Sequence, residues 1–369
     1  MHHRTQYLTN TIAALRHATR HATHRVMLLL VITAVSLTAG AQSPSYPAPL
    51  NFDQGGATQL RTDRPPVLGN LPDGRSLLAY RGIENGTLEV SISEDGVNWS
   101  KPVDTGVRTN GAMAFSYSYK PESSVLQTYL MVYTGRSFQY MTTQDGVTFT
   151  PPQPVKLSID SREPVGSVSP SLSINGGSLA LSLAEKTPGH PPAIDVLLSD
   201  QADGSSFTSL RWFSEVPSTS GATVNSYAPL NSVEPVVGVV FTTRPDNDVF
   251  FAQYSEENPE WFSTDTSLRV AGTPKWLHTF YGFYYFGRSV RDDGQVHDDH
   301  CSHEDHRLIE TYSYDGTNFA PIHTYNLFPK QGIAVGFTPT SRIIVAFLSR
   351  EGDRIETHTA AETDNVSDR

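Results

Sequence analysis

Basic residues recur at matching places in this sequence, each shortly after a short apolar run. Five arginines occupy this place, and Lys186 fills it in the third segment: Arg81, Arg136, Arg244, Arg288 and Arg350. A further arginine, Arg64, precedes the first segment. Planar guanidinium groups suit carboxylates and sugar hydroxyls, because they donate paired hydrogen bonds. The pattern predicts a ring of cations that binds an anionic or sugar ligand; the alternative is that they pair with nearby acids, namely Glu84, Glu185, Asp246, Asp248, Asp292 and Glu351.

Three acids are placed at strand ends on the same side as these cations, namely Asp63, Glu163 and Glu185. Hydrolysis of a glycosidic bond usually needs two carboxyl groups, one of which acts as acid and base. Asp63 and Glu185 are therefore the candidate catalytic groups. The alternative role for each of the three acids is that of a salt-bridge partner.

The segment 291–307 concentrates groups that can bind zinc or copper: His297, Asp298, Asp299, His300, Cys301, His303, Glu304, Asp305 and His306. Their spacing matches no specific metal motif, and we favour a solvated loop at the rim of a pocket. We therefore expect no cofactor and keep four histidines as the only candidate metal ligands: His297, His300, His303 and His306. Cys301 is the only cysteine, so an intramolecular disulfide is excluded.

A repeated strand-and-turn unit must position these groups. The stretch at 88–100, LEVSISEDGVNWS, alternates apolar and polar residues, turns at Asp95-Gly96 and ends on Trp99. Looser copies occupy 141–149, 198–207, 254–261 and 312–319. The period of about 50 to 60 residues is typical of a propeller or another repeat array.

Six strongly apolar runs follow the same period, at 77–80, 129–133, 179–183, 237–241, 281–286 and 343–347. Such runs suit strands that are buried on both faces, as happens where blades pack on each other. We therefore predict an all-β, six-bladed β-propeller, in which a strand from the other terminus closes the sixth blade. Five blades are the alternative, because only five copies of the hairpin unit are visible.

The chain begins with a pattern typical of export. The apolar run at 26–37 follows Arg16, Arg20 and Arg25 and precedes Ala39-Gly40-Ala41, which predicts a signal peptide over 1–41; a membrane anchor is the alternative. We expect a linker or lead-in strand over 42–59, a propeller over 60–360 and a flexible tail over 361–369. The protein should be secreted, periplasmic or at the cell surface, without membrane insertion after cleavage.

The overall charge argues against a nucleic-acid partner. The 369 residues carry a net charge of −11, and removal of residues 1–41, with four arginines and no acid, lowers it to −15. A strongly acidic chain is poorly suited to nucleic acids or anionic membranes.

The Asp-Gly hairpins resemble the Asp box, or BNR repeat, of sialidases and related β-propellers, Ser/Thr-x-Asp-x-Gly-x-Thr-Trp. Three copies match with one residue missing between Asp and Gly: Ser93, Asp95, Gly96 and Trp99; Thr143, Asp145, Gly146 and Phe149; Ser313, Asp315, Gly316 and Phe319. The resemblance implies a turn at the end of the propeller away from the active site. Asp95, Asp145 and Asp315 are therefore expected to be structural.

The segment Asp63-Arg64-Pro65-Pro66 is similar to the start of sialidase domains, where an Arg-Ile-Pro motif supplies one arginine of a triad that binds the substrate carboxylate. Arg64 matches that arginine by position. The loop 81–87 carries no Asp where sialidases have a catalytic one. Asp63 is also similar to the base in the Asp-Pro motif of five-bladed arabinanase-like hydrolases.

The resemblance implies an exported, carbohydrate-active propeller, and our leading hypothesis is a sialidase-like glycoside hydrolase. Arg64 and some of the ring arginines would bind the glycan, and Asp63 or Glu185 would supply acid or base. The alternative is a lectin-like propeller that binds glycans without cleaving them, which the missing Asp favours. A cell-surface scaffold with no small ligand is the third hypothesis.

Overall fold

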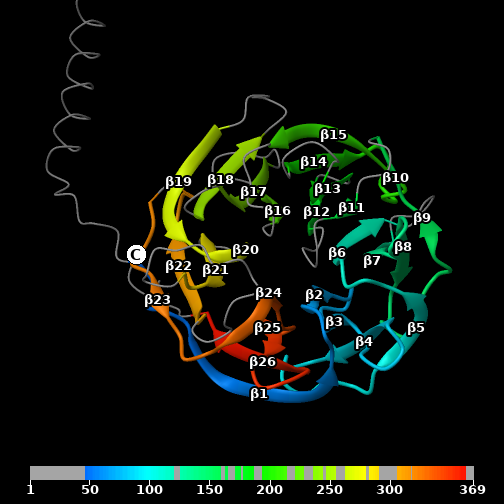
Figure 1. The fold of residues 1–369 in the computed structure, drawn as a ribbon, viewed down its shortest axis with the longest axis horizontal. Coiled ribbons are helices and arrows are strands. Elements are labelled where there is room, and N and C mark those ends of the chain that lie inside the picture. The colour runs from blue at the N-terminus through cyan, green and yellow to red at the C-terminus, as the bar shows by residue number, and fades with distance from the viewer. Residues whose placement is uncertain are drawn as a thin grey trace, which may run out of the picture. The chain divides into compact units, whose positions relative to one another are not determined.

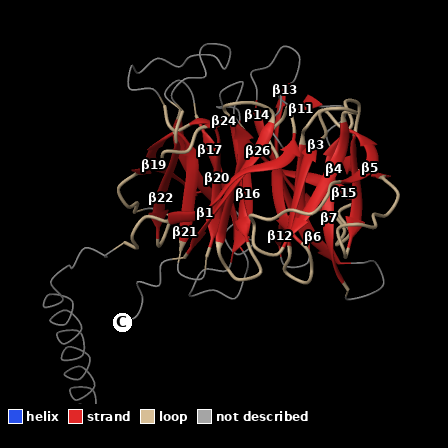
Figure 2. Ribbon diagram, turned by 90° about the horizontal axis from the view of Figure 1, so that it is seen from below, coloured by secondary structure: helices blue, strands red, loops and turns tan. Residues whose placement is uncertain are grey.

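Six antiparallel sheets stand around a common centre in the computed structural model (Figure 1). The strands all lie in the unit formed by Pro47–Arg369. The structure describes residues 46–119, 125–158, 163–164, 171–175, 178–186, 193–213, 221–227, 236–243, 247–254, 262–279, 282–290, 306–316 and 318–362. Within these ranges no helix is long and apolar enough to cross a membrane. Strands make up nearly all of the regular structure (Figure 2).

Each sheet is one blade, and its strands follow one another outward from the centre. The innermost strands are β2 (Val67–Asn70), β6 (Met113–Tyr119), β12 (Ser171–Asn175), β16 (Ala222–Tyr227), β20 (Ala271–His278) and β24 (Pro329–Phe337). The second strands are β3 (Ser76–Arg81), β7 (Leu126–Tyr133), β13 (Ser178–Lys186), β17 (Val236–Thr242), β21 (Phe283–Arg288) and β25 (Ile343–Ser349). The innermost strands contact one another in ring order, so they surround a central channel.

Two further strands complete each blade. The third strands are β4 (Thr87–Ser93), β8 (Phe138–Thr143), β14 (Ala193–Ser199), β18 (Asp248–Tyr254), β22 (Leu308–Ser313) and β26 (Arg354–Ala361). The outer strands are β5 (Val103–Arg108), β9 (Gln153–Pro154), β15 (Ser206–Phe213), β19 (Phe262–Arg269), β23 (His323–Thr324) and β1 (Asn51–Arg61). Blade three also contains β10 (Lys156–Leu157), parallel to β15, and β11 (Glu163–Pro164), antiparallel to β13.

The fold confirms the six-bladed prediction, and the alternative of five blades is wrong. Each predicted apolar run falls on a second strand, from β3 to β25. The last blade is closed from the other end of the chain, because β1 pairs antiparallel with β26. Part of the segment expected to be a linker or lead-in strand is therefore the outer strand of blade six.

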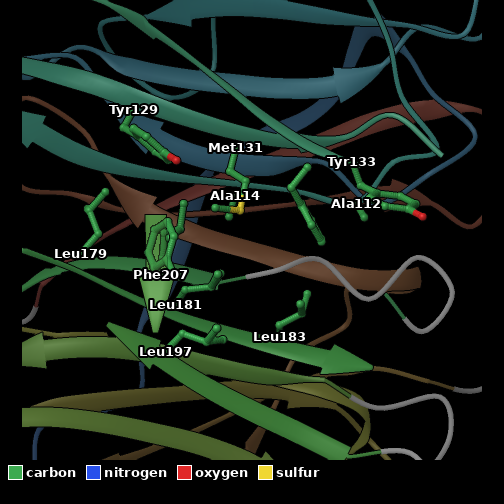
Figure 3. Close-up of a cluster of buried hydrophobic side chains, with 12 residues drawn as sticks. Ala112, Ala114, Tyr129, Met131, Tyr133, Leu179, Leu181, Leu183, Leu197 and Phe207 are labelled. Carbon is green, nitrogen blue, oxygen red and sulfur yellow. The ribbon is translucent and has the colours of Figure 1, made fainter. Parts of the chain in front are cut away.

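Apolar side chains fill the spaces between neighbouring blades. Figure 3 shows the core between blades two and three, where labelled side chains from the two blades interlock: Ala112, Ala114, Tyr129, Met131, Tyr133, Leu179, Leu181, Leu183, Leu197 and Phe207. Burial of each large apolar side chain stabilises the fold by about 1.5–3 kcal/mol. The second strands contribute from both faces, which explains why their sequences are continuously apolar.

The Asp-Gly turns join third and outer strands and are held by the aspartate. Oδ1 of Asp95 accepts hydrogen bonds from the backbone N–H groups of Val97 (2.8 Å) and Asn98 (2.7 Å). The Gly96 N–H donates to Oγ of Ser93 at 2.9 Å. Partial burial works to raise the pKa of Asp95, but the hydrogen bonds outweigh it and lower the pKa to about 2. This aspartate acts on the backbone, as the sequence predicted.

Each described turn of this kind also docks onto the preceding blade. The turn glycines have positive φ, and a Cβ on any of them would lie within 3 Å of a side chain in that blade: Gly96 against Thr359, Gly146 against Ile92, Gly204 against Tyr129, and Gly316 against Phe251. The copy at 254–261 lies mostly outside the described residues. The turns therefore join blades as well as strands.

Candidate functional site at one end of the channel

The predicted cations whose positions the structure describes belong to one end of the blades, opposite the Asp-Gly turns. In blade one, Arg81 pairs with Leu88, whereas Ser93, which begins the turn, pairs with Ser76 at the other end of the same strands. The loops that follow second strands and the entries to innermost strands share the Arg81 end. We call this end of the propeller the arginine end.

Arg81 and Asp63 form an ion pair at the arginine end. Nη1 of Arg81 lies 2.7 Å from Oδ1 and 2.6 Å from Oδ2 of Asp63. Nε of Arg81 donates to the carbonyl oxygen of Thr109 at 3.1 Å, which ties blade one to the entry of blade two. Arg81 therefore has a structural partner on each side. Asp63 occupies the salt-bridge role that the sequence offered as the alternative to catalysis.

Arg64 is exposed, and its guanidinium makes no hydrogen bond or ion pair within the described chain. Its backbone is fixed, because the Arg64 N–H donates to Oγ1 of Thr62 at 3.1 Å and the Thr62 hydroxyl donates to the Arg64 carbonyl at 3.0 Å. Its aliphatic stem lies over Gly111, where a Cβ would come within 2.7 Å of the Arg64 Cγ. A rigid backbone thus presents a guanidinium that is available to a ligand.

Arg288 is buried and joins two innermost strands. Its Nη1 donates to the carbonyl oxygen of Lys330 at 2.8 Å, and its Nε donates to that of Ala271 at 3.3 Å. These carbonyls belong to β24 and β20, so the guanidinium links blade six to blade five. Such contacts give Arg288 a structural role at the channel.

The remaining cations have varied surroundings. Arg136 is exposed after β7, and among the residues described it has no hydrogen-bonding partner. Arg350 lies over the ring of Phe328 at 5.7 Å, and Arg307 contacts the same ring at the same distance. Arg244 lies outside the described residues. So do the side chains of Lys186, Glu163 and Glu185, although their backbones belong to paired strands β13 and β11.

Nothing in the described part of the chain forms a metal site. No group of three or more His, Cys, Asp and Glu residues within those ranges is arranged to hold a metal. His297, His300 and His303 lie outside the ranges. Nδ1 of His306 lies 2.7 Å from the Ser289 carbonyl oxygen, so one ring nitrogen has a backbone partner.

Sequence reasoning missed two polar side chains of the channel, Lys275 on β20 and Gln331 on β24. Both are partly buried. Burial lowers the pKa of Lys275 to about 8, and Oε1 of Gln331 is buried without a partner. For Lys275 the signal was a charged residue inside an innermost strand, whereas Gln331, between Lys330 and Gly332, carried no such signal.

Solved structures share this fold. A point mutant of NanB sialidase from Streptococcus pneumoniae superposes with a TM-score of 0.52 at 11% identity, over 86% of this chain and 70% of that chain. NanB in complex with 2-[(3-chlorobenzyl)ammonio]ethanesulfonate gives 0.50 at 13% identity, over 86% and 71%. The phage phi92 endosialidase gives 0.49 at 10% identity, over 88% and 70%.

The two NanB similarities show the fold alone, because the identities are low. No protein-family model and no curated protein sequence matches the chain. The class defined here is therefore the six-bladed β-propeller fold that NanB sialidase also has.

Proposed function

We propose that this protein is a carbohydrate-active β-propeller that binds an acidic glycan at the arginine end of its channel. The observation that carries the proposal is the state of Arg64. Its guanidinium is exposed and unpartnered within the described chain, whereas Arg81 and Arg288 hold carboxylate or carbonyl groups of the protein itself. A guanidinium fork is suited to the carboxylate of a sugar acid.

The shared fold supports this choice of ligand class. NanB is a sialidase, and the sequence around Arg64 resembles the start of sialidase domains. Fold alone does not assign function, so the proposal depends on the site. The assignment of the Asp-Gly turns to Asp boxes, and export by an N-terminal signal peptide, belong to the same proposal.

Binding without cleavage is the form of the proposal that the geometry favours. Both carboxylate oxygens of Asp63 are engaged by Arg81, so Asp63 has no free oxygen poised as a base. Hydrolysis is the second candidate, because Asp63 directly precedes Arg64 and sits at the same end. It would require Asp63 to separate from Arg81 when substrate binds, and Glu185 to supply the second carboxyl group.

The test is Arg64→Ala, with Lys101→Ala, at an exposed cation after the Asp95 turn, as the control. Both side chains are exposed, so neither substitution should shift the melting temperature. Loss of a charge-assisted hydrogen bond should weaken binding to sialylated or uronate-containing glycans about tenfold or more for Arg64→Ala only. Equal binding by the wild type and Arg64→Ala would remove Arg64 from the site. Turnover that disappears in Asp63→Asn would select hydrolysis.

A further inference from the structure

The seam between blades five and six holds two polar side chains that lack partners. The Lys275 ammonium makes no hydrogen bond or ion pair in the described part of the chain. Oε1 of Gln331 is buried and accepts no hydrogen bond. A buried polar group without a partner costs about 1–3 kcal/mol, so the Gln331 oxygen calls for an explanation, and the partly buried Lys275 ammonium in the same seam lacks a counter-ion in the described chain.

Strand geometry points both side chains into this seam. Nε1 of Trp276 donates to the Thr223 carbonyl in blade four at 3.1 Å, so its neighbour Lys275 faces the opposite way, toward blade six. On β24, a Cβ at Gly332 would lie 3.6 Å from Pro65 of blade one, so Gln331 faces blade five. The strands β20 and β24 contact each other at the centre of the propeller (Figure 1).

The backbone pairing of both strands is irregular near Lys275 and Gln331. The pairing of β20 with β21 skips between Ala271 and Lys275, and that of β24 with β25 skips between Pro329 and Ile333. Arg288 spans the two irregular segments through its hydrogen bonds to Ala271 and Lys330. Bulges of this kind re-aim side chains and are frequent beside binding sites. Here Lys275 and Gln331 lie at or within these two irregular segments.

Among the described strands that make the main contacts with β20, every charged residue is basic. The strands that make the main contacts with β20 are β16, β17, β21 and β24, and they contain no Asp or Glu. Their charged residues are Arg288 and Lys330. On β20 itself, His278 is the only other titratable side chain, and it lies at the far end of the strand. An anion is therefore the ligand that this seam would attract.

We propose that Lys275 and Gln331 form a binding site for a small hydroxycarboxylate. The ammonium of Lys275 donates to the carboxylate, and Oε1 of Gln331 accepts a hydrogen bond from the hydroxyl. Both residues are partly exposed, but Oε1 of Gln331 is buried, so the Gln331 amide must turn toward the channel to reach a ligand. The site uses other residues than Arg64 and does not depend on the glycan-binding proposal.

The test is calorimetric titration and thermal shift with glycolate and with acetate, which lacks the hydroxyl. The wild type should bind glycolate more tightly than acetate. Lys275→Met should weaken glycolate binding about tenfold or more, because a charged hydrogen bond is lost. Gln331→Met should remove the preference for glycolate over acetate. Lys101→Met, at an exposed lysine after the Asp95 turn, should bind as the wild type does.

Two further measurements distinguish this site from the Arg64 site and from a folding defect. Arg64→Ala should retain glycolate binding; its loss would place the anion at Arg64 and overturn the proposal. If Lys275→Met does not fold, acetylation of the wild type should modify Lys275 more slowly when glycolate is present. The proposal would be overturned if the wild type neither bound glycolate nor showed slower acetylation of Lys275 in its presence. It would also be overturned if Lys275→Met bound glycolate as tightly as the wild type.

The pH dependence of glycolate binding is a separate test of the role of Lys275. With a pKa of about 8, Lys275 is mostly charged at pH 6.5 and mostly neutral at pH 9.5. Glycolate affinity should therefore fall between these values in the wild type. An affinity that is the same at both would contradict a role for the ammonium.

Discussion

Arg64 and Arg81 are identical side chains at the same end of one blade, yet their surroundings give them different roles. Arg81 holds Asp63 and the Thr109 carbonyl, whereas Arg64 rests its stem on Gly111 and leaves its guanidinium in solvent. An exposed ion pair such as Arg81–Asp63 contributes at most about 1 kcal/mol to stability. Its larger effect is to fix Asp63 beside Arg64.

Asp145 provides a prediction at the residue scale. Hydrogen bonds from the N–H groups of Thr148 and Val147 lower the pKa of Asp145 from 3.8 to about 2. The folded pKa lies below the unfolded one, so the stability from the charged form is complete above about pH 4 and is lost as the pH falls through 2. Asp145→Asn should lower the free energy of unfolding at pH 7 by about 1 kcal/mol.

The check on Asp145 is chemical denaturation at pH 7, 4 and 1.5. The wild type and Asp145→Asn should converge in stability at the lowest pH. Glu351→Gln, which removes an exposed charge outside any turn of this kind, serves as the control. A constant difference across the three pH values would show that the charge of Asp145 is not the source of its effect.

At the scale of elements, the Asp-Gly turn is the recurring joint of the propeller. The aspartate shapes the turn, the glycine allows close approach to the preceding blade, and the aromatic residue that follows fills the same space. Phe149 packs in the core between blades one and two, and Phe319 in that between blades four and five. The repetition of this sequence pattern therefore reflects a repeated contact between blades.

Gly146→Ala tests the contact between this turn and the preceding blade. Gly146 has φ of 72°, and a Cβ would lie 2.9 Å from Ile92 Cδ1. Backbone strain and overpacking together should reduce the free energy of unfolding by about 2–4 kcal/mol. Gly106→Ala is the matched control, since Gly106 has φ of 74° but open space around its Cα, and it should lose only about 1–2 kcal/mol. Equal losses in urea denaturation would show that close packing is irrelevant.

At the scale of the whole molecule, the ring is held closed by the early strand β1. Its ladder with β26 runs from Asn51 to Arg61, and Phe52 packs edge-on against Tyr325 of blade five at 5.0 Å. The Tyr325 hydroxyl lies 2.9 Å from the Leu50 carbonyl oxygen and also contacts the Glu310 carboxyl. One hydroxyl proton cannot serve two acceptors, so a protonated Glu310 suits this arrangement best.

Glu310 should make closure sensitive to pH. Burial raises the pKa of Glu310 from 4.5 to about 7, although hydrogen bonds from Tyr325 and Leu50 oppose the rise. The folded state holds the proton more tightly than the unfolded state, so stability falls as the pH rises from 4.5 through 7. Glu310→Gln keeps the shape without the charge and should be more stable than the wild type at pH 8.5, by up to about 3 kcal/mol.

Melting temperatures between pH 5 and 8.5 test this expectation. The gap between Glu310→Gln and the wild type should widen as the pH rises, whereas Glu351→Gln should track the wild type. A gap that stays constant with pH, or a less stable variant at pH 8.5, would contradict the role of Glu310.

The sequence was sufficient to predict the number of blades. It was not sufficient to predict which side chains meet within and between them. The runs at 77–80 and 343–347 are apolar because both faces of β3 and β25 are buried, so counting such runs predicted six blades. A salt bridge was the alternative role predicted for Asp63, but Arg81 was not identified as its partner, because the two residues are 18 positions apart and meet only in the folded blade. Lys275 and Gln331 were missed because their shared seam arises from strands that only the closed ring brings together.

The most direct test of the central claim is a crystal structure with an acidic glycan bound. We expect the sugar carboxylate within about 3 Å of the Arg64 guanidinium, at the arginine end of the channel. A glycan bound at the Asp-Gly turns or along an outer strand, with Arg64 left in solvent, would contradict it.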